Sequence, residues 1–181
     1  MREPDPSLIR AAAAGDRDAF SELVRESQAD VWRFLRHLTG DRELAADLTQ
    51  ETFLRVHRSL SSFAFRSRFS TWLFQIARNL AIDESRAAAR RPQLAPELVE
   101  DRAPARPVAV TAHELRCAIE TLAPPQRETF VLVEVFGLGY AEAATVLGIP
   151  PGTVKSRMFH ARRRLVDWFQ SDDSAEAGSD G

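Results

Sequence analysis

Residues 152–168 read GTVKSRMFHARRRLVDW, and on one helix this stretch separates apolar from cationic side chains. At about 100° per residue, the apolar stripe consists of Val154, Met158, Ala161, Leu165 and Trp168. The opposite arc carries Lys155, Ser156, Phe159, His160 and Arg163. The polar face thus includes an aromatic ring, Phe159, among Lys and Arg side chains. This combination favours a surface that binds nucleic acid over the alternative, an arginine-rich face that only contacts solvent.

The residues upstream of this helix indicate a helix-turn-helix motif. Residues 139–147 are predicted to form a short helix that ends at Gly148, and residues 149–152 a tight turn. In this motif the second helix enters the major groove N-terminus first, so that Lys155, Ser156 and Phe159 would meet base edges. Phosphates of the DNA backbone are expected to be contacted by Thr153, Arg157, Arg162 and Arg164.

Length and charge are compatible with one or two domains that face different partners. The chain has 181 residues and a formal net charge of -2. Arginine is in excess over acid at 53–91, acid is in excess at 41–51, and the charged residues after Gln170 are all acidic. A near-neutral total that hides patches of opposite sign predicts surfaces that meet different partners.

The sequence predicts no catalytic residue, metal site or cofactor. The 4 His residues have no metal-ligand spacing to one another or to the single cysteine, Cys117. Cys117 cannot form an internal disulfide, which favours a reducing compartment, and we expect it to be a small buried apolar residue. No apolar run approaches the roughly 20 residues that span a bilayer, and residues 1–10 lack the apolar segment of a signal peptide. We therefore expect a cytoplasmic protein without membrane insertion.

Helical signals dominate the chain, and the predicted fold class is all-α. We expect two small helical domains joined by a flexible linker, the C-terminal one containing the helix-turn-helix. The predicted division is a first domain at 7–90, a linker at 91–110, a second domain at 111–170 and a disordered acidic tail at 171–181.

Local capping and breaking signals predict the helices of each domain. In the first domain we expect helices over 7–14, from Asp16 to about 27, from 31 to Gly40 and from Asp41 to about 60. A serine-rich loop over 60–68 should follow, and then a helix that is capped by Ser70 or Thr71 and ends near 90. In the second domain we expect a helix over 112–122 and another that opens at Pro124, with 130–136 buried.

Three segments together resemble one protein family. They are DLTQETFLRVHRSL at 47–60, FSTWLFQIARNLAID at 69–83 and LAPPQRETFVLVEVFGLGYAEAATVLGIPPGTVKSRMFHARRRL at 122–165. In this order they resemble regions two and four of the extracytoplasmic-function (ECF) branch of bacterial sigma factors, the dissociable promoter-reading subunits of RNA polymerase. The short linker between them is typical of that branch.

The resemblance implies roles for three sets of residues. Asp47, Gln50 and Glu51 match the pattern that grips the clamp helices of the polymerase's largest subunit, and at this spacing they share one helix face. Phe63, Phe65, Arg66, Ser67, Arg68 and Asn79 match the part that opens the minus-10 element and holds a flipped base. Lys155, Ser156, Phe159, His160 and Arg163 match the minus-35 reader. The alternatives are a solvated acidic face at 47–51 and a surface asparagine at 79, and we expect Phe69 and Trp72 in the core.

The chain departs from the family pattern at a few positions. Phe65 stands where a glycine is common, and Ala64 where an arginine is common. His160 occupies a position that is often arginine in relatives, so a bidentate contact to guanine would be lost. Gly139 replaces a frequent capping serine. The departures at Ala64, Phe65 and His160 affect which bases the minus-10 and minus-35 surfaces prefer, whereas Gly139 should weaken the start of its helix only slightly.

The partners implied by the resemblance are core RNA polymerase and promoter DNA, duplex at minus-35 and melted at minus-10. Many relatives are also held inactive by an anti-sigma factor. The alternative function is a helix-turn-helix transcriptional regulator with an N-terminal helical sensory domain, which would bind duplex operators without polymerase. An enzyme is the remaining alternative, and the chain carries no metal cluster, glycine-rich phosphate loop or nucleophile motif.

Overall fold

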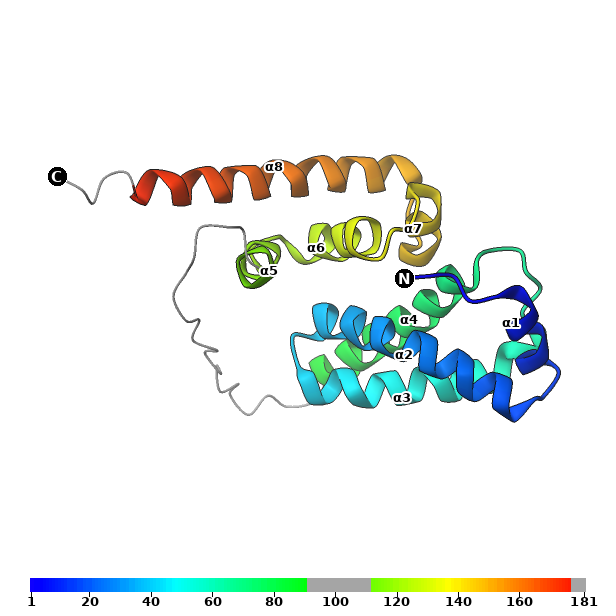
Figure 1. Cartoon of the computed structure of the whole chain (residues 1–181). Helices are drawn as coiled ribbons and strands as arrows, with labels where there is room; N and C mark the ends of the chain where they lie inside the picture. Colours follow the sequence, from blue (N-terminus) through cyan, green and yellow to red (C-terminus); the bar gives the residue numbers. More distant parts are fainter. Residues whose placement is uncertain (91–111, 177–181) are drawn as a thin grey trace.

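The computed structural model describes residues 1–90 and 112–176, with side chains over 1–90 and 114–170. Its described part is helical and forms two lobes (Figure 1). The first lobe contains α1 (Pro6–Ala13), α2 (Arg17–Thr39), α3 (Arg42–Ser59), the 3-10 turn η1 (Leu60–Ser62) and α4 (Phe69–Arg90). The second lobe contains α5 (Ala112–Glu120), α6 (Pro124–Phe130), the π-helical turn η2 (Val131–Val135), α7 (Tyr140–Leu147) and α8 (Pro151–Glu176). The predicted linker, 91–110, and residues 177–181 lie outside the described residues.

Aspartate caps begin the first three helices of the first lobe. The carboxylates of Asp5, Asp16 and Asp41 each accept hydrogen bonds from backbone N–H groups in the following turn. Gly40 ends α2 in the left-handed conformation, with φ 71°. The predicted caps at Asp16 and Asp41 and the predicted stop at Gly40 are therefore confirmed.

Helix α2 is continuous, whereas the sequence predicted a break near residue 27. Leu23, Ser27, Val31 and Phe34 are all fully buried and keep the helical period on one face. Ser27 occupies an apolar position of that period, and this polar residue interrupts the apolar pattern in the sequence. With no Gly or Pro nearby, the backbone has no reason to end the helix there.

The sequence predicted that Ser70 or Thr71 caps helix α4. The structure shows instead that a distant residue caps it. The helix starts at Phe69, and the Glu3 carboxylate accepts hydrogen bonds from the backbone N–H of Phe69 at 2.5 Å and of Ser70 at 3.3 Å. Ser70 and Thr71 are buried, and their hydroxyls have no hydrogen-bond partner among the described residues. A carboxylate from 66 residues upstream thus provides the negative charge that a helix N-terminus favours.

The second lobe carries the helix-turn-helix as predicted, with small differences at element ends. Pro124 and Pro125 open α6, Gly139 is the N-cap of α7, and Gly148 ends α7 with φ 65°. The Glu142 carboxylate accepts a hydrogen bond from the Gly139 N–H at 2.7 Å, which compensates for the absent serine side chain. Helix α5 ends at Glu120 and α8 begins at Pro151, one or two residues from the predicted bounds.

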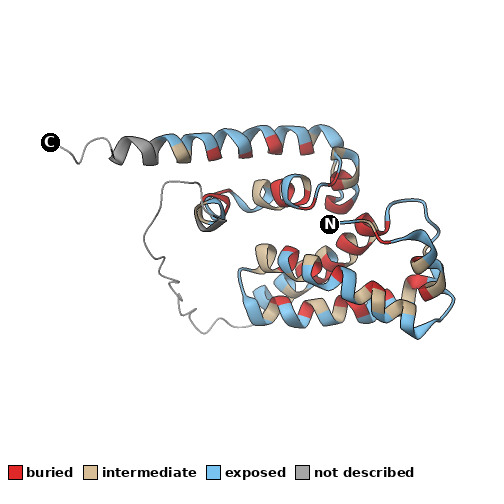
Figure 2. Cartoon of the chain, in the orientation of Figure 1, coloured by how far each residue is buried: buried red, intermediate tan, exposed pale blue. Residues whose placement is uncertain are grey.

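Three sequence predictions for the second lobe need correction. Cys117 is half-buried and not fully buried. Within 130–136, Glu134 and Val135 are exposed, because the π-helical turn rotates them outward. Helix α8 continues to Glu176, so that 171–176, predicted as the start of a disordered tail, is helical. Figure 2 shows α8 buried along the side that faces α6 and exposed along the other.

The two lobes pack against each other through an aromatic cluster. The Phe136 ring centroid lies 4.8 Å from that of Phe74 and 6.0 Å from that of Phe34, and all three side chains are buried. Beside this cluster, the Arg78 Nε donates to the Glu128 carboxylate at 2.6 Å and its Nη2 at 3.3 Å. Helix α4 also packs on α7. The two units that the sequence predicted as separately folded domains therefore share an interface.

We predict that Glu3→Ala lowers the free energy of unfolding by about 1–2 kcal/mol, because two N–H groups at the start of α4 lose their acceptor. Urea denaturation followed by circular dichroism measures this change. Glu22→Ala is the control, because Glu22 pairs only with the exposed Arg25 in its own helix and should shift stability by less than about 0.5 kcal/mol. An equal midpoint for Glu3→Ala and the wild type would contradict the capping role.

We also predict a loss of stability in mild acid that depends on His37. Burial at the end of α2 lowers the pKa of the His37 imidazole, Arg127 of α6, Arg36 and Arg116 lower it further, and Glu120 opposes them. The folded chain therefore binds fewer protons at this site than the unfolded chain, and stability falls as pH drops below about 6.5. Thermal unfolding at pH 7.5 and 5.5 should show a smaller difference for His37→Gln. An identical pH dependence of both proteins would refute this role.

Candidate functional site

Helix α8 has a solvent-exposed face opposite a stripe of mostly buried apolar residues. Val154, Met158, Ala161 and Leu165 are buried, and Trp168 is half-buried, which confirms the predicted stripe. On the opposite side the exposed residues are Lys155, Ser156, Phe159, His160 and Arg163. Phe159 is 62% exposed, with its ring 5.5 Å from the His160 ring. The Phe159 ring is thus available for contact with a ligand that approaches this face.

One flank of this face is partly engaged within the lobe. Arg162 donates a hydrogen bond to the Glu134 carboxylate of η2 at 2.5 Å, and this contact raises the pKa of the guanidinium. Arg157 is half-buried. The backbone N–H of Thr153, which was predicted to contact a phosphate, donates to the Pro150 carbonyl at 2.9 Å. Thr153 therefore has its hydroxyl, and not its N–H, to offer a ligand.

The other flank of α8 faces a shallow basic cleft. About 320 Å³ of space lies between α8 and the junction of α5 and α6. Its lining residues are Thr121, Ala123, Gln126, His160, Arg163, Arg164 and Asp167. The structure thus brings two predicted base readers, His160 and Arg163, together with Arg164. The contributions of Thr121 and Gln126 were missed, because no local pattern in the sequence joins the α5–α6 junction to α8.

Helix α3 carries the predicted acidic and polar set on its outer side. Asp47 and Gln50 are exposed, and Glu51 is half-buried with its carboxylate 3.2 Å from Arg55 Nε. Leu54, one turn further along, is 52% exposed. The structure confirms one shared face and extends it by an apolar residue that the sequence analysis did not select.

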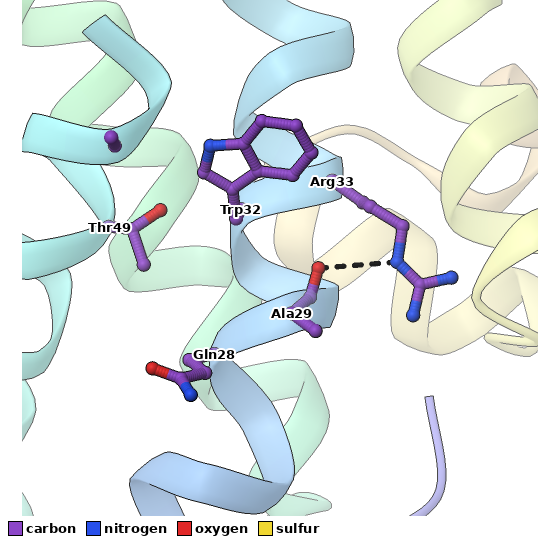
Figure 3. A pocket seen from close by; sticks show the side chains of 6 residues that line it. Gln28, Ala29, Trp32, Arg33 and Thr49 are labelled. Atoms are coloured by element: carbon purple, nitrogen blue, oxygen red, sulfur yellow. Dashed lines mark hydrogen bonds between the residues drawn. The ribbon is translucent and has the colours of Figure 1, made fainter. Parts of the chain in front are cut away.

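An apolar cleft of about 480 Å³ opens next to this face, between α2 and α3. It is lined by Gln28, Ala29, Trp32, Arg33, Ala46 and Thr49 (Figure 3). The Trp32 indole forms one wall, and Arg33 is held by a hydrogen bond from its Nε to the Ala29 carbonyl at 3.2 Å. The sequence analysis did not select Trp32 as a site residue. The small side chains of Ala29 and Ala46 leave the cleft open. The sequence could not predict this, because alanines at such positions also allow two helices to pack closely.

The loop between η1 and α4 holds a cluster of aromatic rings. The Phe63 ring lies 5.0 Å from Trp72 and 4.8 Å from Phe65, and Phe63 and Trp72 are half-buried. Phe69 is buried, as predicted, whereas Trp72 is only partly so. The cluster is thus anchored in the core at one end and open to solvent at the other.

Phe65 has a backbone conformation that disfavours its side chain. Its φ is 54°, in the left-handed region that a non-glycine residue adopts at a cost of roughly 1–2 kcal/mol. Its side chain is 43% exposed, with the Arg10 guanidinium 5.2 Å above the ring. The left-handed backbone gives a physical reason why glycine would suit this position.

The polar residues of the predicted minus-10 set are not all gathered in one place. Arg66, Ser67 and Arg68 are exposed in the loop, and Asn79 is exposed on α4. Asn79 lies ten residues beyond the start of α4, about 15 Å along the helix axis. The guanidinium of Arg68 is 3.4 Å from Glu3 and 3.6 Å from Glu142.

Both lobes match known protein families. The family described as Sigma-70 region 2 matches residues 23–91, and that described as Sigma-70, region 4 matches residues 112–165. The two lobes therefore define a sigma-70-type transcription factor. The region 2 match covers most of the domain that the alternative interpretation took as sensory, so a helix-turn-helix regulator is not favoured.

Curated relatives define the branch. The ECF RNA polymerase sigma factor SigC of Mycobacterium tuberculosis is 38% identical over 172 residues, which are 92% of each chain. SigM of the same species is 35% identical over 162 residues, covering 90% of this chain and 83% of the relative. The chain belongs to the ECF RNA polymerase sigma factors.

Solved structures agree with this assignment. CnrH in complex with the cytosolic domain of CnrY aligns with a TM-score of 0.68 and 26% identity, over 92% of this chain and 97% of that one. The sigma factor RpoE in complex with the anti-sigma factor NepR, from Bartonella quintana, gives the same score and identity over 84% and 98%. Within residues 1–90 and 112–176, no helix has the length and apolarity needed to cross a membrane.

We predict opposite outcomes for two neighbouring substitutions in α8. Met158→Ala should destabilise the second lobe by about 2–5 kcal/mol, because Met158 is 1% exposed and leaves a cavity. Phe159→Ala should change the free energy of unfolding by less than about 0.5 kcal/mol, because its ring contacts mainly solvent. Chemical denaturation of both variants measures the difference. Equal destabilisation would mean that α8 packs through another face.

Proposed function

We propose that this sigma factor reads duplex minus-35 DNA with α8, binds core RNA polymerase with α3, and holds the melted minus-10 strand with the 63–68 loop and Asn79. The observation that carries the proposal is the exposed Phe159 ring among cationic side chains, on a helix whose opposite side is buried from Val154 to Leu165. A packed back fixes the orientation of the reading face, which sequence-specific recognition requires.

At the minus-35 element, the N-terminal half of α8 would enter the major groove. Lys155, Ser156 and Phe159 are the exposed side chains nearest that end and would meet base edges. His160 and Arg163 would contact the element from the side of the basic cleft, where Arg164 adds a charge for the DNA backbone. An imidazole ring lacks the forked pair of N–H donors of a guanidinium, which supports a base preference at this position that differs from that of an arginine.

At the minus-10 element, the aromatic cluster would form the wall on which an unpaired base stacks. Phe63 and Phe65 are the members of the cluster that lie in the loop and face solvent at least in part. Arg66, Ser67 and Arg68 would contact the single strand, and Asn79 would hydrogen-bond a base further along it.

Core polymerase would cover the outer side of α3 and the neighbouring cleft. Asp47, Gln50 and Glu51 provide a polar rim, and the cleft beside Trp32 can take an apolar side chain. An apolar anchor inside a polar rim is the usual arrangement of a strong protein interface.

The further partners follow from the same assignment. Both aligned structures are complexes with a second protein. In one of them the second protein, NepR, is described as an anti-sigma factor. We propose that an anti-sigma factor also controls this chain in the cytoplasm. No catalytic role is proposed, since phosphodiester chemistry belongs to the polymerase and the sigma factor contributes binding energy.

We predict that Asp47→Ala/Glu51→Ala weakens binding to purified core polymerase at least tenfold, and that Ala46→Trp does so by filling the cleft. Gel filtration and fluorescence anisotropy measure the complex, and run-off transcription from promoters of the source genome measures its activity. Glu26→Ala, an exposed carboxylate of α2 outside the cleft lining, is the control and should bind normally. If Asp47→Ala/Glu51→Ala and Ala46→Trp both bind core polymerase with wild-type affinity, α3 is not part of the polymerase interface. A chain that binds operators as a dimer and never co-elutes with core would favour the regulator.

A further inference from the structure

A guanidinium of α1 lies over the exposed aromatic ring of the loop that precedes α4. The Cζ atom of Arg10 is 5.2 Å from the centroid of the Phe65 ring, within the range of a cation–π contact. Both side chains are exposed. Helix α1 packs on η1, which places Arg10 beside the loop although the two lie far apart in the sequence. The sequence analysis did not select Arg10, because no local pattern joins α1 to the loop.

Arg10 makes no ion pair within residues 1–90 and 114–170, in contrast to an arginine of the loop itself. The guanidinium of Arg68 lies 3.4 Å from Glu3 and 3.6 Å from Glu142, so it already has two anionic neighbours. Arg10 has an aromatic ring as its neighbour instead. A guanidinium binds phosphate with a forked pair of N–H donors. The charge of Arg10 is therefore available to a phosphate that comes close to the loop.

The spacing of the rings determines how a base can reach Phe65. The ring centroids of Phe63 and Phe65 are 4.8 Å apart. A base between two planar groups requires about 7 Å, twice the roughly 3.4 Å of one stacking step, so no base fits between these two rings as they stand. The gap between Phe65 and the Arg10 guanidinium, at 5.2 Å, is too narrow as well. A base that stacks on this face of Phe65 must therefore displace the guanidinium.

We infer that Arg10 is a further strand-binding residue of the minus-10 surface, and that its guanidinium has two positions. In the free chain it covers the Phe65 ring. When an unpaired base stacks on that ring, the guanidinium leaves it and binds the phosphate of the same nucleotide. The inference rests on the proposed function of the 63–68 loop, and it adds a residue of α1 to a surface otherwise formed by the loop and α4.

The exchange is favourable on both sides. The base replaces the guanidinium as the group that covers the Phe65 ring, and base–aromatic stacking does not depend on the identity of the base. The guanidinium exchanges an exposed cation–π contact for a charge-assisted hydrogen bond, which is the stronger of the two. Arg10 is an exposed residue with a long side chain, so the movement requires rotamer changes and no displacement of α1.

The test uses full-length chains assembled with core RNA polymerase, and core polymerase alone gives the background. The probe is a fluorescein-labelled single-stranded DNA of about 12 nucleotides and mixed sequence, titrated by anisotropy at about 50 mM and about 300 mM salt. We expect Arg10→Gln to weaken binding about fivefold at the lower salt, the effect of one lost charge-assisted contact. At the higher salt the loss should fall below about twofold, because one phosphate contact contributes about 0.7 to the slope of log affinity against log salt.

Two control variants separate a phosphate contact from a general effect of charge. Arg42→Gln makes the same change in net charge at an exposed position. Arg42 begins α3, and the loop follows the other end of this 18-residue helix, about 27 Å away, so this variant should bind like the wild type. Arg10→Lys keeps the positive charge and should keep the wild-type salt slope. Both variants and Arg10→Gln should unfold at the wild-type denaturant midpoint, because the substituted side chains are exposed.

A double-mutant cycle tests the coupling between Arg10 and Phe65. Phe65→Gly removes the ring and suits the left-handed backbone, with φ 54°, so the loop should keep its course. In this background Arg10→Gln should weaken probe binding less than about twofold, because no stacked base holds the phosphate within reach. An equal fivefold loss in both backgrounds would mean that Arg10 acts independently of Phe65, and it would overturn the exchange.

The remaining outcomes separate the inference from the proposed function. If Arg10→Gln matches Arg42→Gln in affinity and slope while Arg66→Gln in the loop weakens probe binding, the inference is wrong and the proposed function stands. A loss of affinity with an unchanged slope would also overturn the inference, since Arg10 would then act only on the shape of the loop. Failure of the minus-10 surface has a different signature. Neither Arg66→Gln nor Phe65→Gly would then alter probe binding, and the inference would fail with it.

Discussion

The packing of Phe136 against Phe34 and Phe74 forms the buried aromatic centre of the interface between the two lobes of this sigma factor. Burial of three aromatic side chains supplies a few kcal/mol, and the Arg78 and Glu128 side chains beside them are only 18% and 13% exposed. At this low exposure the pair is less screened by salt than an exposed one. The positions of Arg78, of α7 on α4 and of the basic cleft relative to α3 all depend on this shared interface.

Local periodicity in the sequence predicted the features that depend on residues within one helix. It did not predict contacts between residues far apart in the sequence. The buried stripe of α8 and the caps at Asp16 and Asp41 follow from neighbours in sequence, so that spacing was sufficient. The Glu3 cap of α4 and the Arg78–Glu128 pair join residues 66 and 50 positions apart, and no local pattern marks them. Ser27 shows the opposite failure, in which one buried polar residue concealed a continuous helix.

For the candidate surfaces, the sequence predicted which residues are exposed, but it did not predict the clefts beside them. Exposure at Asp47, Gln50 and the reading face of α8 agrees with the pattern of each helix. The cleft beside Trp32 could not be predicted, because alanines that open a cavity and alanines that allow close helix packing look alike in a sequence. The resemblance to a family predicted where the loop lies, and only the backbone angle at Phe65 explained why a glycine would suit that position.

Helix α8 runs without a break over 26 residues, close to 39 Å, and only its first turns fit inside a major groove. Its sequence is basic from Lys155 to Arg164 and acidic from Asp167 onward, and the peptide dipole has the same polarity, positive at the N-terminal end. The helix is therefore a rigid rod with an electrostatic direction. In the field of a polyanion, this charge distribution favours the orientation in which the basic N-terminal end points toward the polyanion and the acidic end away from it.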